Sequence, residues 1–165
     1  MLFWNSIKLA LEKRKVNKFL QNISIDNVDA LDGYDFEVLT SVLLKNCGFK
    51  CKLTPKSKDY GVDILASKNG LTLAVQTKLY YNHSVGNKGV QEAFSGKKYF
   101  DANIAVLITN SIFTKNAINS AKKLNVMLLG REELCALISG TPKQNSQLFD
   151  KWIYENLKGK MDETS

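Results

Sequence analysis

The chain has 165 residues, of which 44% are hydrophobic and 24% are charged, and its formal net charge is +7. This length and composition suit one globular domain with a substantial core and exclude a disordered chain. The surplus of lysine and arginine favours a polyanionic partner, with nucleic acid ahead of an anionic membrane surface. A basic solvated surface without a partner is the alternative reading of the charge.

The cysteines are Cys47, Cys51 and Cys135, and the one histidine is His83. An odd number of cysteines without a Cys-x-x-Cys pair argues against a zinc site, because too few ligands have the right spacing. Buried free thiols in a reducing compartment are the simplest account, which predicts a cytoplasmic location. A nucleophilic pair of a cysteine with the histidine has no support in the sequence.

Residues 1–21 start apolar and become basic, with hydrophobic positions at helical spacing. The apolar start is too short to span a bilayer, and it lacks the features of a signal peptide. We expect a basic amphipathic helix that packs on the domain or mediates a homodimer. A membrane-surface anchor, which is not the expected role, and a DNA-contacting arm are the alternatives. We divide the chain into this helix and a polar connector (1–30), a central domain (31–140) and a C-terminal helix and tail (141–165).

The sequence pattern of the central domain predicts an alternation of helices and strands. Helices are expected over residues 31–49, 89–100, 114–124 and 131–138, with a last one at 149–157. Strands are expected over 49–53, 62–66, 71–75, 104–109 and 126–129. In the second of these helices we expect Val90, Ala93, Phe94 and Tyr99 to face inward. An early hairpin followed by alternation predicts an α/β fold, with a mixed central sheet flanked by helices on both faces.

The chemistry-bearing stretch runs from Asp63 to Lys78, where two apolar runs are joined by a turn at Asn69-Gly70. Asn-Gly is a strong hairpin signal, and the hairpin brings Asp63 close to Gln76 and Lys78. The last two residues are two positions apart on one strand and point to the same face. A carboxylate, an amide and an ammonium therefore gather at the open end of the hairpin.

This set of groups suits hydrolysis of a phosphodiester by an activated water with the help of a divalent cation. Mg²⁺ prefers oxygen ligands, which Asp63, the Gln76 side-chain carbonyl and the Thr77 backbone carbonyl can supply. Lys78 can orient the water and stabilise developing charge. Glu37, on the first predicted core helix, can hold a metal-bound water if that helix packs across the hairpin. Taken alone the pattern is weak, because a salt bridge with a surface lysine has the same appearance.

Two loops flank the hairpin and carry basic and aromatic side chains. Aromatic groups interleaved with lysines can contact a nucleic-acid backbone or stack on bases, although ordinary loop packing gives the same composition. The candidate DNA-binding residues are Lys56, Lys58, Tyr80, Tyr81, His83 and Lys88.

From about Leu31 to Ser139 the chain resembles the Mrr-type restriction endonuclease family, within the PD-(D/E)xK nuclease superfamily. The matching pieces, in the family's order and spacing, are Asp35-Phe36-Glu37, Asn46-Cys47-Gly48-Phe49, Ser57 to Ile64, Val75-Gln76-Thr77-Lys78, Val85-Gly86, Val90-Gln91-Glu92, Ile108 to Ser111, Phe113-Thr114, Ala117, Leu128 and Leu134.

The resemblance implies that Asp63 is the metal-binding aspartate and that Gln76 and Lys78 form a Q-x-K version of the (D/E)-x-K pair. It implies that Glu37 is the helix glutamate of the active site. The expected activity is that of a magnesium-dependent DNA endonuclease, with Mn²⁺ able to substitute, in defence or mobile-element DNA processing. A non-cleaving DNA-binding module of the same fold is the alternative, and a membrane-surface or scaffold protein is a third hypothesis.

Asp59 and Gln91 fall in the family's motifs, and only supporting roles are expected for them. Gln76 departs from the general superfamily pattern, which has an acid at this position. Because a neutral ligand attracts a cation less strongly, we expect weak metal binding in the absence of DNA phosphate.

Overall fold

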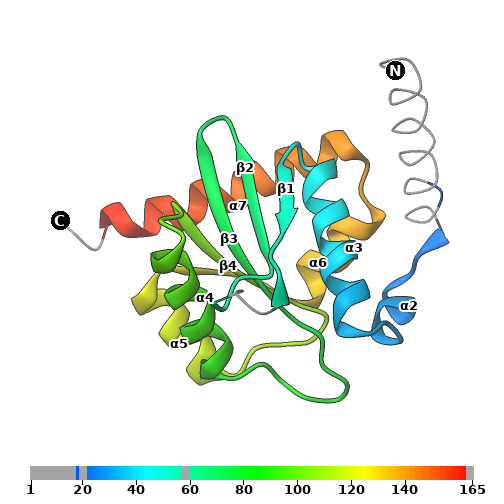
Figure 1. Cartoon of the computed structure of the whole chain (residues 1–165), viewed down its shortest axis with the longest axis horizontal. Helices are drawn as coiled ribbons and strands as arrows, with labels where there is room; N and C mark the ends of the chain where they lie inside the picture. Colours follow the sequence, from blue (N-terminus) through cyan, green and yellow to red (C-terminus); the bar gives the residue numbers. More distant parts are fainter. Residues whose placement is uncertain (1–17, 19–21, 57–59, 163–165) are drawn as a thin grey trace.

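The computed structural model describes residues 18, 22–56 and 60–162, so the helix expected over residues 1–21 lies outside the described residues except for position 18. The described elements (Figure 1) are α2 Ile25–Asp29, α3 Gly33–Asn46, β1 Lys50–Leu53, β2 Ile64–Lys68, β3 Leu71–Lys78, α4 Asn87–Tyr99, β4 Ile104–Thr109, α5 Lys115–Leu124, β5 Val126–Leu129, α6 Arg131–Ser139 and α7 Pro142–Asp162. Within the described part of the chain, no helix is long and apolar enough to cross a membrane.

The five strands form one mixed sheet in the order β1-β2-β3-β4-β5. The first three strands pair antiparallel, and the β2–β3 hairpin turns at Asn69-Gly70 as expected. The last three strands pair parallel, so β3 has an antiparallel neighbour on one side and a parallel neighbour on the other. Every residue of β4 is buried, as its continuous apolar sequence predicts for a strand covered on both faces.

Helices cover both faces of the sheet, as predicted (Figure 1). Residues of α3, α6 and α7 share one hydrophobic core with one face of the sheet, and α4 and α5 cover the other. The largest fully buried side chains are Phe36, Phe149, Leu39, Leu43, Leu44, Ile64, Leu73, Ile104, Leu107, Ile108, Leu129 and Leu134.

Two parts of the helical structure differ clearly from the sequence prediction. The polar connector contains α2, where Ser24 and Asn27 form a reciprocal capping box, and Val28 is fully buried. The last helix begins at Pro142 rather than at residue 149. Proline is favoured in the first turn of a helix, where its missing N–H is not needed, which explains why the helix starts at Pro142.

Tyr99 was expected to face inward, and this expectation is wrong. Its side chain is exposed, and its ring stacks on Tyr60 with 3.8 Å between ring centroids. The hydroxyl of Tyr60 beside it raises the pKa of Tyr99 above its usual value. The partner ring comes from the loop before β2, which helical periodicity alone does not reveal.

The loop before β2 packs directly on α4 through two glycines. Gly61 has φ +81°, and a Cβ there would lie 2.6 Å from the Glu92 carbonyl oxygen. A Cβ at Gly96 would overlap a Val62 methyl group and lie 2.9 Å from the Gly61 carbonyl oxygen. Only residues without side chains allow this close approach, which fixes the path of the chain into Asp63.

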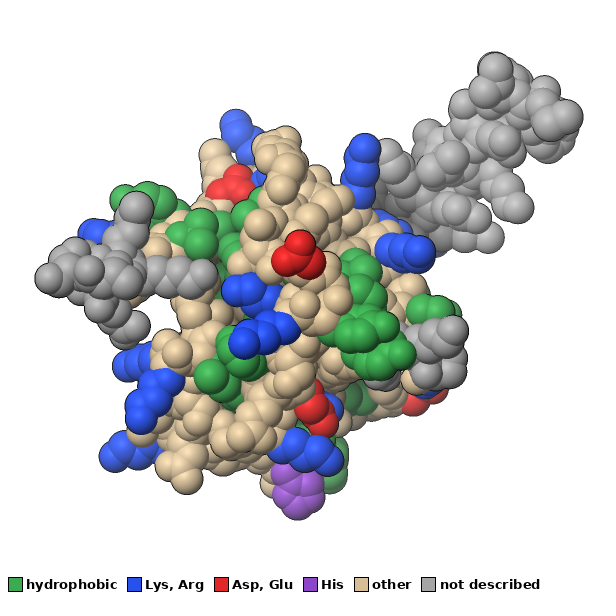
Figure 2. All heavy atoms as spheres, turned by 60° about the vertical axis from the view of Figure 1, so that its left-hand side comes forward, with side chains coloured by type: hydrophobic (Ala, Val, Ile, Leu, Met, Phe, Trp, Pro, Cys, Tyr) green, Lys and Arg blue, Asp and Glu red, His purple; other side chains and the backbone are tan. Residues whose placement is uncertain are grey.

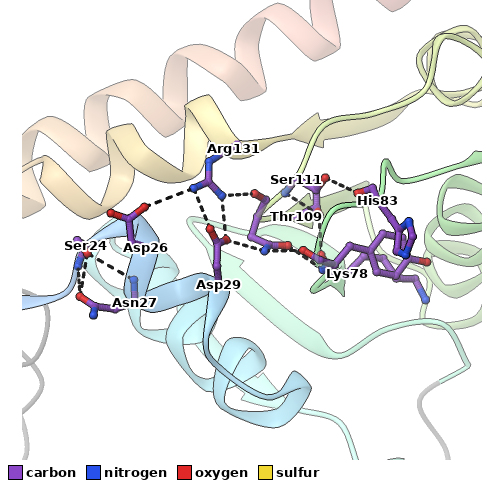
Figure 3. A network of polar contacts seen from close by, with 11 residues as sticks. Ser24, Asp26, Asn27, Asp29, Lys78, His83, Thr109, Ser111 and Arg131 are labelled. Atoms are coloured by element: carbon purple, nitrogen blue, oxygen red, sulfur yellow. Dashed lines mark hydrogen bonds and ion pairs between the residues drawn. The ribbon is translucent and has the colours of Figure 1, made fainter.

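A polar network holds the chain that follows β3 (Figure 3). Arg131 donates to both carboxylate oxygens of Asp29, at 2.8 and 2.9 Å. The Asn110 amide donates to Asp29 at 2.8 Å and to the Tyr80 carbonyl at 2.9 Å. The Tyr80 N–H donates back to the Asn110 side chain at 2.8 Å. Through this network α2 and α6 immobilise the backbone just beyond the open end of the hairpin.

Two hydroxyl groups extend the network toward β3 and the following loop (Figure 3). Thr109 donates to the Lys78 carbonyl at 2.6 Å, and Ser111 donates to the His83 carbonyl at 2.5 Å. The backbone at Lys78 and the loop that carries His83 are therefore both tied to the end of β4.

The glycine contact predicts that Gly96→Ala lowers the free energy of unfolding by about 1–3 kcal/mol, the usual cost of overpacking a close contact. Gly159→Ala is the matched control, because Gly159 also lies in a helix but has no atom within 4 Å of an added Cβ. The control should be neutral or slightly stabilising. Urea denaturation of both variants checks the prediction, and equal stabilities would contradict it.

The Arg131 guanidinium beside Asp29 lowers the pKa of that carboxyl below its usual value. A lowered pKa means that the pair stabilises the fold above the unfolded-state pKa and that this stability is lost as the pH falls. We predict that Asp29→Asn costs roughly 1 kcal/mol at neutral pH, the scale for a partly exposed hydrogen-bonded pair. The cost should shrink below about pH 4, where the unfolded-state carboxyl also becomes protonated. Thermal melts of both proteins from pH 3 to 7 measure this, and a pH-independent difference would argue against it.

Candidate active site

Asp63 lies at the open end of the hairpin, immediately before β2. Its N–H donates to the Val75 carbonyl at 2.8 Å, and the pairing of Ile64 with Val75 places Asp63 across from Gln76. Asp63 and Gln76 are both buried, with relative exposures of 9% and 7%. The hairpin therefore brings these two residues together, as expected from the sequence.

One carboxylate oxygen of Asp63, Oδ2, accepts three hydrogen bonds. The donors are the Gln76 amide Nε2 at 2.8 Å, the Thr77 N–H at 2.7 Å and the Thr77 hydroxyl at 2.8 Å. Hydrogen bonds to a charged oxygen are stronger than neutral ones, and three of them define the position of this carboxylate closely.

The Gln76 amide nitrogen also donates to the Thr77 carbonyl oxygen, at 3.1 Å. It therefore lies between the Asp63 carboxylate and the Thr77 carbonyl, two of the three oxygens expected to bind a cation. Such oxygens attract both an N–H group and a cation, so the amide nitrogen occupies the position that a cation would need. A half-turn of the amide would withdraw the nitrogen and present the Gln76 oxygen instead.

Lys78 forms an ion pair with Glu92, with 2.5 Å between Nζ and Oε2. Glu92 lies on α4, and its other carboxylate oxygen is 3.9 Å from the ammonium of Lys88. Sequence reasoning placed Glu92 within a family motif but gave it no role. Helical spacing could have drawn attention to Glu92. Val90 and Ala93 are buried on the face of α4 that meets β3 and β4, and residue 92 lies at the margin of that face.

The hydrogen bonds of Asp63, Gln76 and Thr77 described above do not involve the remaining predicted site residues. Glu37 is half-buried in α3, a helix that packs on β1, β2 and β3, and its approach to the cluster around Asp63 stays a prediction. Gln91 is exposed on α4, next to Glu92. Asp59 and Lys58 lie outside the described residues.

The other candidate DNA-binding side chains are solvent-accessible. Tyr81 is 74% exposed and Tyr80 is 39% exposed, and both follow β3 directly. His83 and Lys88 are exposed on the same loop and at the start of α4, and Lys56 is exposed with its ammonium 5.6 Å from the ring centroid of Tyr34. On the face shown in Figure 2, lysine and arginine side chains are spread widely and acidic ones are few, with the single histidine at the rim. This distribution suits contact with a polyanion.

A hollow of about 670 Å³ lies away from the candidate site, between the chain before α2 and the turn from α6 to α7. It is lined by Ile23, Asn46, Leu137 and Pro142 among others and includes none of the predicted site residues. The candidate site is therefore identified by its polar groups and not by the size of a cavity.

Two of the three thiols are poor nucleophiles. Burial raises the pKa of Cys47 to about 12 and that of Cys51 to about 11, so both are protonated at neutral pH. All three cysteines are free. Cys47 is buried as expected, whereas Cys51 and Cys135 are only partly buried.

The oxygen-rich donor set fits a hard divalent cation. No group of three or more histidine, cysteine or acidic residues within the described ranges could hold a metal ion. A cation here would depend on Asp63, neutral oxygens from Gln76 and Thr77, water and substrate phosphate. Mg²⁺ commonly binds in this way, with one or two carboxylates and the remaining positions filled by water and phosphate.

Comparison with solved structures gives three matches of related fold. The DNA modification-dependent restriction endonuclease AspBHI has a TM-score of 0.58 at 19% identity, over 86% of this chain and 40% of that one. The MspJI restriction endonuclease, in complex with a 27-mer oligonucleotide, has a TM-score of 0.54 at 21% identity, over 74% of this chain and 30% of that one. The protein of unknown function AF1548 has a TM-score of 0.53 at 18% identity, over 59% of this chain and 57% of that one.

The chain thus corresponds to little more than half, or less, of each of these proteins. At these identities the likeness shows the fold, which is that of restriction endonucleases. No curated protein matches the sequence. The family model Mrr_cat, described as restriction endonuclease, matches residues 28–138, which is well over half of the chain and includes the hairpin, α4 and α6. The chain therefore belongs to the Mrr_cat restriction endonuclease family, in agreement with the resemblance read from its motifs.

Proposed function

We propose that this protein is a metal-dependent DNA endonuclease that hydrolyses phosphodiester bonds with an activated water. The observation that carries the proposal is the hydrogen-bonded cluster of Asp63, Gln76 and Thr77 with Lys78 two residues further along the same strand. It combines the oxygen ligands and the cationic group that the reaction needs. Family membership supports nuclease activity, and the net charge of +7 supports a DNA substrate.

Each residue has a separate proposed role. Asp63, the Gln76 carbonyl oxygen and the Thr77 backbone carbonyl would hold the cation, with Mg²⁺ as the expected ion and Mn²⁺ as a substitute. The cation would supply charge neutralisation and a more acidic bound water. Lys78 orients the attacking water and stabilises negative charge that develops on the phosphate. Glu37 would hold a water bound to the cation.

The loop between β3 and α4 is the proposed DNA contact, together with Lys56 and with Lys58, which lies outside the described residues. Tyr80, Tyr81 and His83 lie on this loop, and the network around Asn110 fixes its first residues. A loop held at its base can present aromatic and basic side chains to a DNA backbone with little loss of conformational entropy.

The wider setting is also a proposal. Residues 31–140 form the nuclease domain, and the helix expected over residues 1–21 provides a homodimer contact that would allow two sites to cut both strands of a duplex. The three free thiols suit a reducing compartment such as the cytoplasm. Defence or the processing of mobile-element DNA is the context proposed for this activity.

One observation favours a second candidate, a DNA-binding module of the same fold that does not cleave. The Gln76 amide nitrogen donates hydrogen bonds to the Asp63 and Thr77 oxygens that would bind a cation, and Gln76 carries no charge to attract the cation. This candidate predicts salt-sensitive DNA binding without turnover.

We predict that the purified protein nicks or cuts plasmid DNA with Mg²⁺ or Mn²⁺ and that Lys78→Ala or Asp63→Asn lowers the rate by about 100-fold or more. Removing one group that stabilises transition-state charge has an effect of this order. Lys151→Ala is the matched control, because Lys151 also pairs with a glutamate but lies on α7. Agarose gel assays on supercoiled, linear and branched DNA measure cleavage. A wild-type protein that is inert on all three with both metals would contradict the proposal.

Gln76→Glu tests the metal site without relying on cleavage. A carboxylate at this position cannot donate to Asp63 and repels it, so the variant should melt at a lower temperature in EDTA. Mn²⁺ should then raise its melting temperature more than that of the wild type, because the site has gained a negative charge. Gln147→Glu, an exposed change on α7, controls for added charge. If Mn²⁺ affects both variants equally, the cation does not bind at residue 76.

A further inference from the structure

The ion pair between Lys78 and Glu92 belongs to the candidate site, and no role has been given to its acidic partner. Glu92 pairs with the Lys78 ammonium, with 2.5 Å between Oε2 and Nζ. The two side chains are 23% and 29% exposed, so the pair is partly shielded from solvent. Lys88, the second cation near Glu92, is 90% exposed and lies at 3.9 Å, which makes it the weaker partner.

The backbone that carries Glu92 is held firmly. Gly61 approaches the Glu92 carbonyl so closely that an added Cβ would meet it at 2.6 Å, and Gly96 packs against Val62 one turn further along α4. The same loop leads into Asp63. One rigid contact therefore positions both the metal-binding candidate and the carboxylate that pairs with Lys78.

The electrostatic consequence follows from the neutral residue at position 76. Asp63 is the one charged group among the three proposed ligands, and Lys78 lies on the same face of β3 as Gln76. An ammonium without a partner in this position would repel a divalent cation. Pairing with Glu92 cancels that positive charge and leaves the negative charge of Asp63 available to the cation.

We propose that Glu92 is a positioning residue of the metal site, which acts through Lys78 and supplies from α4 the negative charge that Gln76 does not provide. This inference rests on the proposed function, because it concerns the cation that the function requires. It goes further in assigning a role to a residue outside the hairpin and to an ion pair between β3 and α4.

The test is a double-mutant cycle on Mn²⁺ affinity, measured by electron paramagnetic resonance without DNA. Glu92→Gln should weaken Mn²⁺ binding about five- to tenfold, the scale expected for an uncompensated charge close to the cation in a partly shielded site. Glu92→Gln combined with Lys78→Gln should bind within about twofold of the wild type, because the net charge near the cation is restored. Glu92→Asp, which keeps the charge, should also bind close to the wild type.

Glu155→Gln is the matched control, because it removes a glutamate that pairs with a lysine on α7 at 3.8 Å. Unchanged affinity in Glu92→Gln would overturn the inference while leaving the proposed function intact. So would a double variant that binds as weakly as Glu92→Gln, since that result assigns Glu92 a structural role only. A wild-type protein that binds no Mn²⁺ at millimolar concentration, either alone or with a DNA duplex, would instead overturn the proposed metal site, and this inference with it.

Discussion

The three hydrogen bonds accepted by one oxygen of Asp63 hold the candidate site together. They join the start of β2 to the end of β3, at the point where β3 has an antiparallel strand on one side and a parallel strand on the other. Without them the buried Asp63 carboxylate would lose three hydrogen bonds and the Thr77 hydroxyl would lose its acceptor, which is costly in a protein interior. The same contacts gather the oxygen atoms that a divalent cation would use.

Rigid packing on two sides determines where this cluster lies. On one side, Gly61 and Gly96 let the loop before β2 rest on α4, which places Glu92 beside Lys78. On the other side, Asp29, Asn110 and Arg131 fix the chain that leaves β3. The two polar side chains that β3 contributes to the site, Gln76 and Lys78, each have an internal partner. Cation binding would therefore exchange existing contacts instead of filling an unstructured space.

Much of the fold and part of the candidate site were predictable from the sequence, because they depend on local patterns. Apolar runs, the Asn-Gly turn and helical spacing predicted the five strands, the larger helices and the contact of Asp63 with Gln76. The inward direction assigned to Tyr99 was wrong, since Tyr60 approaches from another part of the chain. The orientation of the Gln76 amide and the pairing of Lys78 with Glu92 were likewise not predictable, because both depend on tertiary contacts between segments distant in sequence. The helix at residues 1–21 stays a prediction.

A crystal structure of the protein with Mn²⁺ and a short DNA duplex, with anomalous scattering data to locate the metal, tests the proposed metal site most directly. We expect a Mn²⁺ ion bound by Asp63, with the Gln76 side-chain oxygen turned toward the ion and the Thr77 carbonyl among its ligands. We also expect Lys78 to lie beside the scissile phosphate. A structure in which the DNA is bound, no metal lies at Asp63 and the Gln76 nitrogen still donates to its carboxylate would show that this site does not bind the cation.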